Sequence, residues 1–86
     1  MAAIELSDGV LRFSADKTYL YFTATATAAD TIDFASVLAG RRIGSVIGAN
    51  VTDGVNLTYT YTAAGVVTVP AGPSADEISV IIHFVE

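Results

Sequence analysis

The residues with the clearest chemical potential are one histidine and two pairs of nearby carboxylates. His83 is the only histidine, so a general base would have to be this residue or a carboxylate with a raised pKa. It lies between Ile81 and Val85, with no serine or cysteine nucleophile pattern close to it in the sequence. We therefore expect a strand histidine at or beside an interface, where its titration would make association depend on pH between about 5 and 7.

The paired carboxylates are candidates for holding a hard cation such as Ca²⁺, which takes six to eight oxygen ligands. The pairs are Asp30 with Asp33, and Asp76 with Glu77. Neither has the spacing of a known calcium loop, and capping and turn roles account for Asp33 and Asp76 equally well. The glycines form no phosphate-binding loop, and no zinc spacing or nucleophile elbow occurs. The sequence thus predicts no catalytic residue, no metal, no cofactor and no enzymatic activity.

Two Tyr-x-Tyr pairs are candidates for contact with a sugar or a protein, because a tyrosine ring combines an apolar body with a polar tip. The pairs are Tyr19 with Tyr21, and Tyr59 with Tyr61. Leu20 and Phe22 take the core side of the first strand, so Tyr19 and Tyr21 should point outward. The second pair shares a side with Leu57 and should point inward. The outward pair is the better contact candidate.

A single β-rich domain, residues 1–86, must position these side chains. The length of 86 residues allows one domain, and 52% hydrophobic against 15% charged residues is the composition of a chain that folds. β-Branched and aromatic residues alternate with Thr or Ala between Gly, Asp and Asn, a pattern typical of strands and turns. We predict an all-β fold, a small β-sandwich or open barrel of about seven antiparallel strands with at most one short helical turn.

The first half of the chain carries four predicted elements. Ser7-Asp8-Gly9 predicts a hairpin between residues 4–6 and 10–13, and the alternation over 18–27 predicts the longest strand. Residues 30–40 favour a short strand and then one helical turn, which Asp33 caps and Gly40 ends. Residues 42–51 predict a strand that kinks at its two glycines, Gly44 and Gly48.

The second half carries three more. Asp53-Gly54 predicts a turn before a single alternating strand over 57–62. Ala63-Ala64-Gly65 predicts a hairpin turn into a strand over 66–69, and residues 70–74 form another turn. The last strand covers 77–85.

The last strand is hydrophobic on both faces. One face carries a core row, which consists of Ile78, Val80, Ile82 and Phe84. The other face carries Ile81 and Val85 around His83, so either another element or a neighbouring subunit must cover it. The small size and the mean hydropathy of +0.57 favour a subunit. We expect an interface that includes Tyr19, Tyr21, Arg41, Arg42, Ile81, His83 and Val85.

Charge excludes some partners. The net charge is −5 and the pI is near 4.4, values that disfavour nucleic acid and anionic membranes. Arg41-Arg42 is the only basic pair, too small for a lipid or nucleic-acid patch, and it could instead dock an acidic protein scaffold. No apolar run approaches the length of a membrane span, and the N-terminal residues do not resemble a secretory leader.

The end of the chain resembles a known group of proteins. Residues 63–72, AAGVVTVPAG, and residues 74–82, SADEISVII, combine a Gly-x-Val-Thr-Val strand, a Pro/Gly/acidic turn and a hydrophobic strand. In this style the chain resembles small structural proteins of tailed bacteriophages, notably capsid decoration (cement) and head-fibre proteins. The resemblance covers about the last third of the chain, with a weaker echo in residues 30–38. It implies a virion component without catalytic residues, often trimeric, that is made in the host cytoplasm and adds to a capsid or tail surface.

Two functions follow as hypotheses. The first is a structural capsid decoration subunit that forms a homo-oligomer, a trimer by the resemblance, and binds the major capsid protein or another virion scaffold. The alternative is a carbohydrate- or receptor-binding module of a phage tail or fibre. That module would use Tyr19, Tyr21 and the turns at 53–54 or 70–74.

Overall fold

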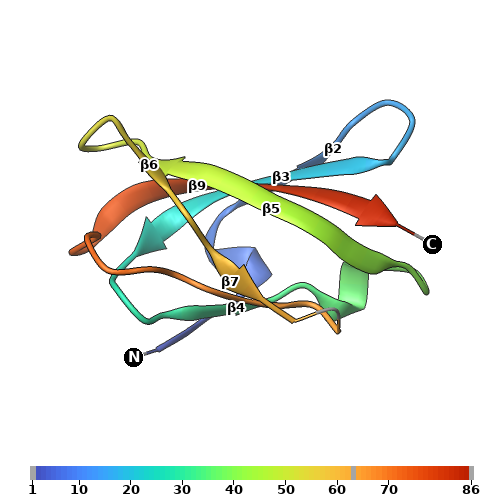
Figure 1. Ribbon diagram of the computed structural model, residues 1–86, viewed down its shortest axis with the longest axis horizontal. Coiled ribbons are helices and arrows are strands. Elements are labelled where there is room, and N and C mark those ends of the chain that lie inside the picture. Colours follow the sequence, from blue (N-terminus) through green and yellow to red (C-terminus); the bar gives the residue numbers. More distant parts are fainter. Residues whose placement is uncertain (1, 63, 86) are drawn as a thin grey trace.

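The computed structural model describes residues 2–62 and 64–85 and shows two β-sheets packed face to face (Figure 1). The five-stranded sheet has the order β2 (Val10–Phe13), β3 (Tyr19–Ala26), β9 (Asp76–Val85), β5 (Arg42–Asn50) and β6 (Val55–Leu57). The four-stranded sheet has the order β1 (Ala3–Ile4), β4 (Thr31–Asp33), β8 (Val66–Thr68) and β7 (Thr60–Tyr61). Two single 3-10 turns complete the described elements, η1 (Leu6–Asp8) and η2 (Ala35–Val37).

The predicted all-β fold is confirmed, and its details differ in three respects. The described residues form nine strands instead of about seven, because five of them are only two or three residues long. One pair, β1 with β4, is parallel. There are two helical turns instead of one. No helix among the described residues is long and apolar enough to cross a membrane.

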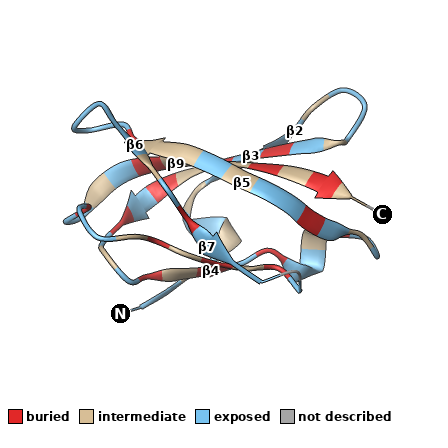
Figure 2. Ribbon diagram, in the orientation of Figure 1, coloured by how far each residue is buried: buried red, intermediate tan, exposed pale blue. Residues whose placement is uncertain are grey.

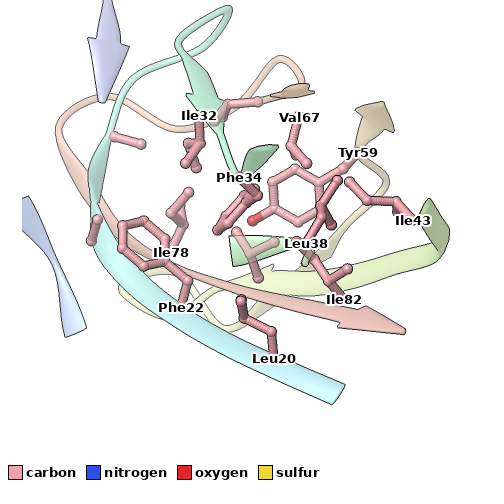
Figure 3. Close-up of a cluster of buried hydrophobic side chains, with 14 of the residues drawn as sticks. Leu20, Phe22, Ile32, Phe34, Leu38, Ile43, Tyr59, Val67, Ile78 and Ile82 are labelled. Atoms are coloured by element: carbon pink, nitrogen blue, oxygen red, sulfur yellow. The ribbon is translucent and has the colours of Figure 1, made fainter. Parts of the chain in front are cut away.

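The core lies between the sheets and follows from alternation in the two long strands. In β3 the residues Leu20, Phe22, Ala24 and Ala26 are buried, and in β9 the buried residues are Ile78, Val80, Ile82 and Phe84. Alternate residues of a strand point to opposite faces, so each strand gives one complete face to the core (Figure 2). Phe22 meets Phe34 edge to face across the core, with ring centroids 5.5 Å apart (Figure 3).

The predicted opening hairpin is wrong. Residues 3–4 pair with β4 in the four-stranded sheet, whereas β2 pairs with β3 in the other sheet. The segment between them is η1, in which the amide of Asp8 donates to the carbonyl of Glu5 at 2.9 Å. Gly9 is extended, with φ −135°. Its lack of a Cβ serves close packing instead, because a Cβ there would lie 2.1 Å from the Thr23 carbonyl oxygen.

The predicted single strand over residues 57–62 is also wrong. Residues 55–57 pair with β5 in the five-stranded sheet, and residues 60–61 pair with β8 in the four-stranded sheet. The chain crosses between the sheets at Tyr59, which is only 5% exposed and donates its hydroxyl to the Ser79 carbonyl at 2.7 Å. Because β6 ends at Leu57 and Tyr61 belongs to β7, the two tyrosines do not share an inward side, and Tyr61 is 40% exposed.

Several turn predictions are confirmed. Residues 31–33 form β4 and η2 follows, as predicted, but the predicted cap and end are wrong. The N-cap is Phe34, without a side-chain cap, and the turn ends at Val37, before Gly40. Asp33 instead accepts the amide of Ala35 at 2.9 Å. The register of β5 against β9 shifts between Ile43 and Ser45, which confirms the predicted kink at Gly44, but it is continuous through Gly48, where the second predicted kink is wrong. Strands β7 and β8 form the predicted hairpin; Gly65 in its turn has φ +119°, and Ala63 lies outside the described residues.

Candidate functional site

The candidate site is the outer face of the five-stranded sheet, the side that points away from the four-stranded sheet. The pairing of strands aligns one row of side chains across it. Arg12 pairs with Tyr21, Tyr21 with Ile81, and Ile81 with Ile47, so the row runs across β2, β3, β9 and β5. Of the predicted interface residues, Tyr19, Tyr21, Ile81, His83 and Val85 all belong to this face.

Apart from Arg12 on β2, the row is apolar, and two of its apolar side chains are highly exposed. Ile47 is 61% exposed and Tyr21 is 48% exposed, values far above those of core residues. Ile81 lies between them and is half-buried. Strand β9 is central in its sheet, and its outward residues from Ser79 to Val85 are half-buried. Figure 2 shows this mixture of exposed and intermediate residues along β3, β9 and β5.

The histidine sits beside this row and contacts an aromatic ring. The His83 ring lies 4.9 Å from the ring of Tyr19, centroid to centroid, at an interplanar angle of 32°. Tyr19 is itself 43% exposed, so the pair is accessible on the outer face. It lies next to the Ile81 row, toward the end of β9. A stacked, partly exposed imidazole of this kind is a contact group for an aromatic or polar partner surface.

The loop between β2 and β3 fixes the position of Tyr19. The Tyr19 amide donates to the Ser14 hydroxyl at 3.1 Å, and that hydroxyl donates to the Asp16 carboxylate at 2.8 Å. Thr18 donates both its amide and its hydroxyl to the same carboxylate oxygen. The hydrogen bonds from Thr18 and Ser14 lower the pKa of Asp16, because they stabilise its charged form.

The two arginines that were predicted to act together have different surroundings. Arg41 donates to the carbonyls of Leu38 and Lys17, and its guanidinium lies 4.3 Å from the centroid of the Phe84 ring. These contacts join the η2 loop to the β2–β3 loop, so Arg41 has a structural role. Arg42 is exposed and pairs with Val85 at the edge of the outer face.

A shallow groove of about 440 Å³ borders the row. It is lined by Ile47, Gly48, Ala49, Asn56, Leu57, Ser79 and Ile81. None of these side chains titrates, and the lining is mainly aliphatic. The groove therefore suits an apolar side chain of a partner better than a reacting substrate.

The tyrosines and turns of the predicted carbohydrate site lie at opposite ends of the sheet. Tyr19 pairs with His83, whereas the turn at 53–54 follows Asn50, which pairs with Ile78. Five residues of strand separate these rows, a distance of about 17 Å. The turn at 70–74 lies at that far end too, because the Ala28 amide, beyond the end of β3, donates to the Pro73 carbonyl. These groups cannot meet around one small sugar.

Three of the four carboxylates that were considered as cation ligands, Asp30, Asp33 and Asp76, accept hydrogen bonds from the protein. Asp30 is buried and accepts the amides of Ala2 and Thr27, each at 2.9 Å. Asp76 accepts from the Asn50 side chain at 3.0 Å and from the Ser74 amide at 3.2 Å. Within residues 2–62 and 64–85, no group of three or more potential metal ligands gathers.

Sequence reasoning missed Ile47, the most exposed large hydrophobic side chain of the described residues. Regular alternation from Ile43 would put Ile47 on the same inward face, since the two are four residues apart. The shift at Gly44 moves Val46 inward, opposite Ile82, and turns Ile47 outward, opposite Ile81. The glycines in this segment indicated a bulge. Had the bulge been assigned to Gly44, the outward position of Ile47 would have followed.

Comparisons of this chain with protein-family models, with curated protein sequences and with solved structures found no match.

Proposed function

We propose that this protein is a non-enzymatic structural subunit that self-associates through the outer face of its five-stranded sheet and adds to a larger protein scaffold. The scaffold is proposed from the resemblance of residues 63–82 to tailed-phage structural proteins. It would be a virion capsid, to which this protein adds as a decoration subunit during assembly in the host cytoplasm.

The observation that carries the proposal is the apolar row of exposed Tyr21, half-buried Ile81 and exposed Ile47 at the centre of the outer face. Burying apolar surface contributes about 25 cal/mol per Å², so such a row gains most from a partner that removes it from water. A chain of 86 residues has little interior of its own, and association adds buried surface to it.

The chemistry of the face supports binding instead of turnover. Its histidine stacks on Tyr19, and its groove is lined by aliphatic and small polar side chains. General acid–base catalysis needs a base within hydrogen-bond reach of a nucleophile or substrate and an orienting group behind it. The contacts of His83 support a role in an interface.

Sedimentation equilibrium tests self-association. At micromolar concentration we expect a mass of a small multiple of the 8.9 kDa chain. The variant Ile47→Glu should shift the mass toward the monomer, because a carboxylate in the centre of the face would have to be desolvated. Val55→Glu is the matched control: Val55 is also highly exposed, but it pairs with the inward-facing Asn50. A wild-type monomer at all concentrations would refute the proposal.

Immunogold electron microscopy tests the scaffold. Antibody against this protein is applied to phage particles produced by cells that carry its gene. Regular labelling of the capsid surface is the expected result. Labelling of the tail or fibre alone would favour the receptor-binding alternative, and particles without any label would refute a role in the virion.

A further inference from the structure

We propose that the partner of the outer face is a second copy of this chain, packed face to face across a two-fold axis beside Ile81, with the strands of the two sheets antiparallel. The inference rests on the proposed self-association and names its geometry. It makes the basic unit a dimer, in place of the trimer that the resemblance implies.

The size of the face suits such a pair. Strand β9 has ten residues, about 33 Å at 3.3 Å per residue, and four strands with 4.8 Å spacing span about 14–19 Å. The area of the face is therefore about 500–600 Å² per copy, or about 1,000–1,200 Å² for two copies, which just reaches the roughly 1,000 Å² that a specific interface needs. A partner that covered only one end or edge of the sheet would bury much less.

The face is also complementary to itself, as a two-fold interface requires. It has a projecting aliphatic side chain, Ile47, and next to it the groove that Ile47 and Ile81 border. When the centres of two faces meet, Ile47 of each copy can lie over the groove of the other copy. One surface thus supplies both the projection and the hollow.

Charge selects the antiparallel orientation. Arg12 lies in the central row, and two other basic groups lie at the end of the sheet where β9 finishes. Arg42 pairs with Val85 there, and Lys17 lies in the loop that precedes Tyr19, the partner of His83. The end where β9 begins carries Glu77 on the outer face, while Asp76 and Asp53 at the same end accept from the inward-facing Asn50 amide. Asp16 is an acidic exception at the basic end, where it accepts bonds from Ser14 and Thr18.

Parallel strands would place like charges over each other at both ends of the interface. Antiparallel strands place the Glu77 end of one copy over the Arg42 end of the other, twice by symmetry. For a chain with a net charge of −5, this orientation offsets part of the repulsion between copies.

A spin-label distance and a mass test the arrangement together. The chain has no cysteine, so Thr25→Cys provides a unique labelling position. Thr25 is exposed and pairs with Glu77, four residues from the Ile81 row. Antiparallel packing puts the two labels at about 28 Å, from twice 13 Å along the strands and about 10 Å between sheets, whereas parallel packing puts them at about 14 Å.

The expected result is a particle of about 18 kDa, two copies of the 8.9 kDa chain, with the longer label distance. Ile47→Glu should raise its dissociation constant at least tenfold, and Val55→Glu should leave it unchanged. A mass near 27 kDa, a short label distance, or a dimer insensitive to Ile47→Glu would overturn this inference while leaving self-association intact. A monomer would overturn both.

Discussion

Tyr59 offers a prediction with two independent signatures. It lies where the chain crosses between the sheets, and its buried hydroxyl donates to the Ser79 carbonyl at 2.7 Å. Replacing it by phenylalanine keeps the ring and removes only this hydrogen bond. At pH 7–8 we expect Tyr59→Phe to lower the free energy of unfolding by about 1–2 kcal/mol, the usual cost of losing a buried hydrogen bond.

The second signature is an opposite effect at alkaline pH. Burial raises the pKa of Tyr59 to about 12 from its ordinary value of 10.0, because the phenolate is costly to desolvate. Between these values the unfolded chain has lost the proton and the folded chain keeps it. Wild-type stability therefore falls by about 2 kcal/mol as pH rises from 10 to 12.

Tyr59→Phe has no such group, so its stability is free of this loss. The difference between the two proteins should shrink above pH 10 and reverse sign before pH 12. Urea unfolding at a fixed protein concentration and at several pH values from 8 to 11.5 measures it, with Tyr61→Phe as control because the Tyr61 hydroxyl is exposed. Parallel pH curves for wild type and Tyr59→Phe would refute the argument.

Three further substitutions test the packing, each measured by urea or thermal unfolding. Gly48→Ala should cost several kcal/mol, since a Cβ would lie 1.9 Å from the Ser79 carbonyl oxygen; an unchanged midpoint would show that β5 can move. Asn50→Ala should cost about 2–3 kcal/mol, because the buried amide donates to Asp76 and Asp53, and a cost below about 0.5 would contradict this account. Phe22→Ala should cost about 3–5 kcal/mol and leave little folded protein, whereas retention of a cooperative transition at the wild-type midpoint would mean that the core is elsewhere.

The parts of the fold that were predictable from sequence are those with long, regular alternation. Strands β3 and β9 each repeat a small or apolar inward residue every second position for eight residues or more, so local pattern alone assigns their faces. The order of strands was not predictable, because pairing depends on contacts between distant residues. Nothing local to residues 77–85 says that β9 lies between β3 and β5.

The errors in the predicted fold arose where a local sequence pattern reflects a contact with residues far away in the sequence. Asp8-Gly9 has the composition of a hairpin turn, but Gly9 is required by the closeness of Phe22 and Thr23. Residues 57–62 alternate like one strand, but the chain leaves one sheet for the other at Tyr59. A period of two is preserved across such a crossing, so periodicity cannot reveal it.

For the candidate site, the sequence identified the central residues but not their neighbours. The outward position of Tyr19 and Tyr21 followed from the inward Leu20 and Phe22, and it is confirmed by their exposure. Their alignment with Ile81 and His83 required the register of β3 against β9, which the structure supplies. That these residues form an interface stays a prediction.

The central place of β9 also bears on the synthesis of the protein. Strands β3 and β5 are not neighbours, and each finds its inner partner only in residues 76–85. A nascent chain that ends before these residues holds two separated halves of the sheet with their apolar sides uncovered. Folding must therefore wait until this segment leaves the ribosome, and until then the emerging chain is a substrate for chaperones or for aggregation.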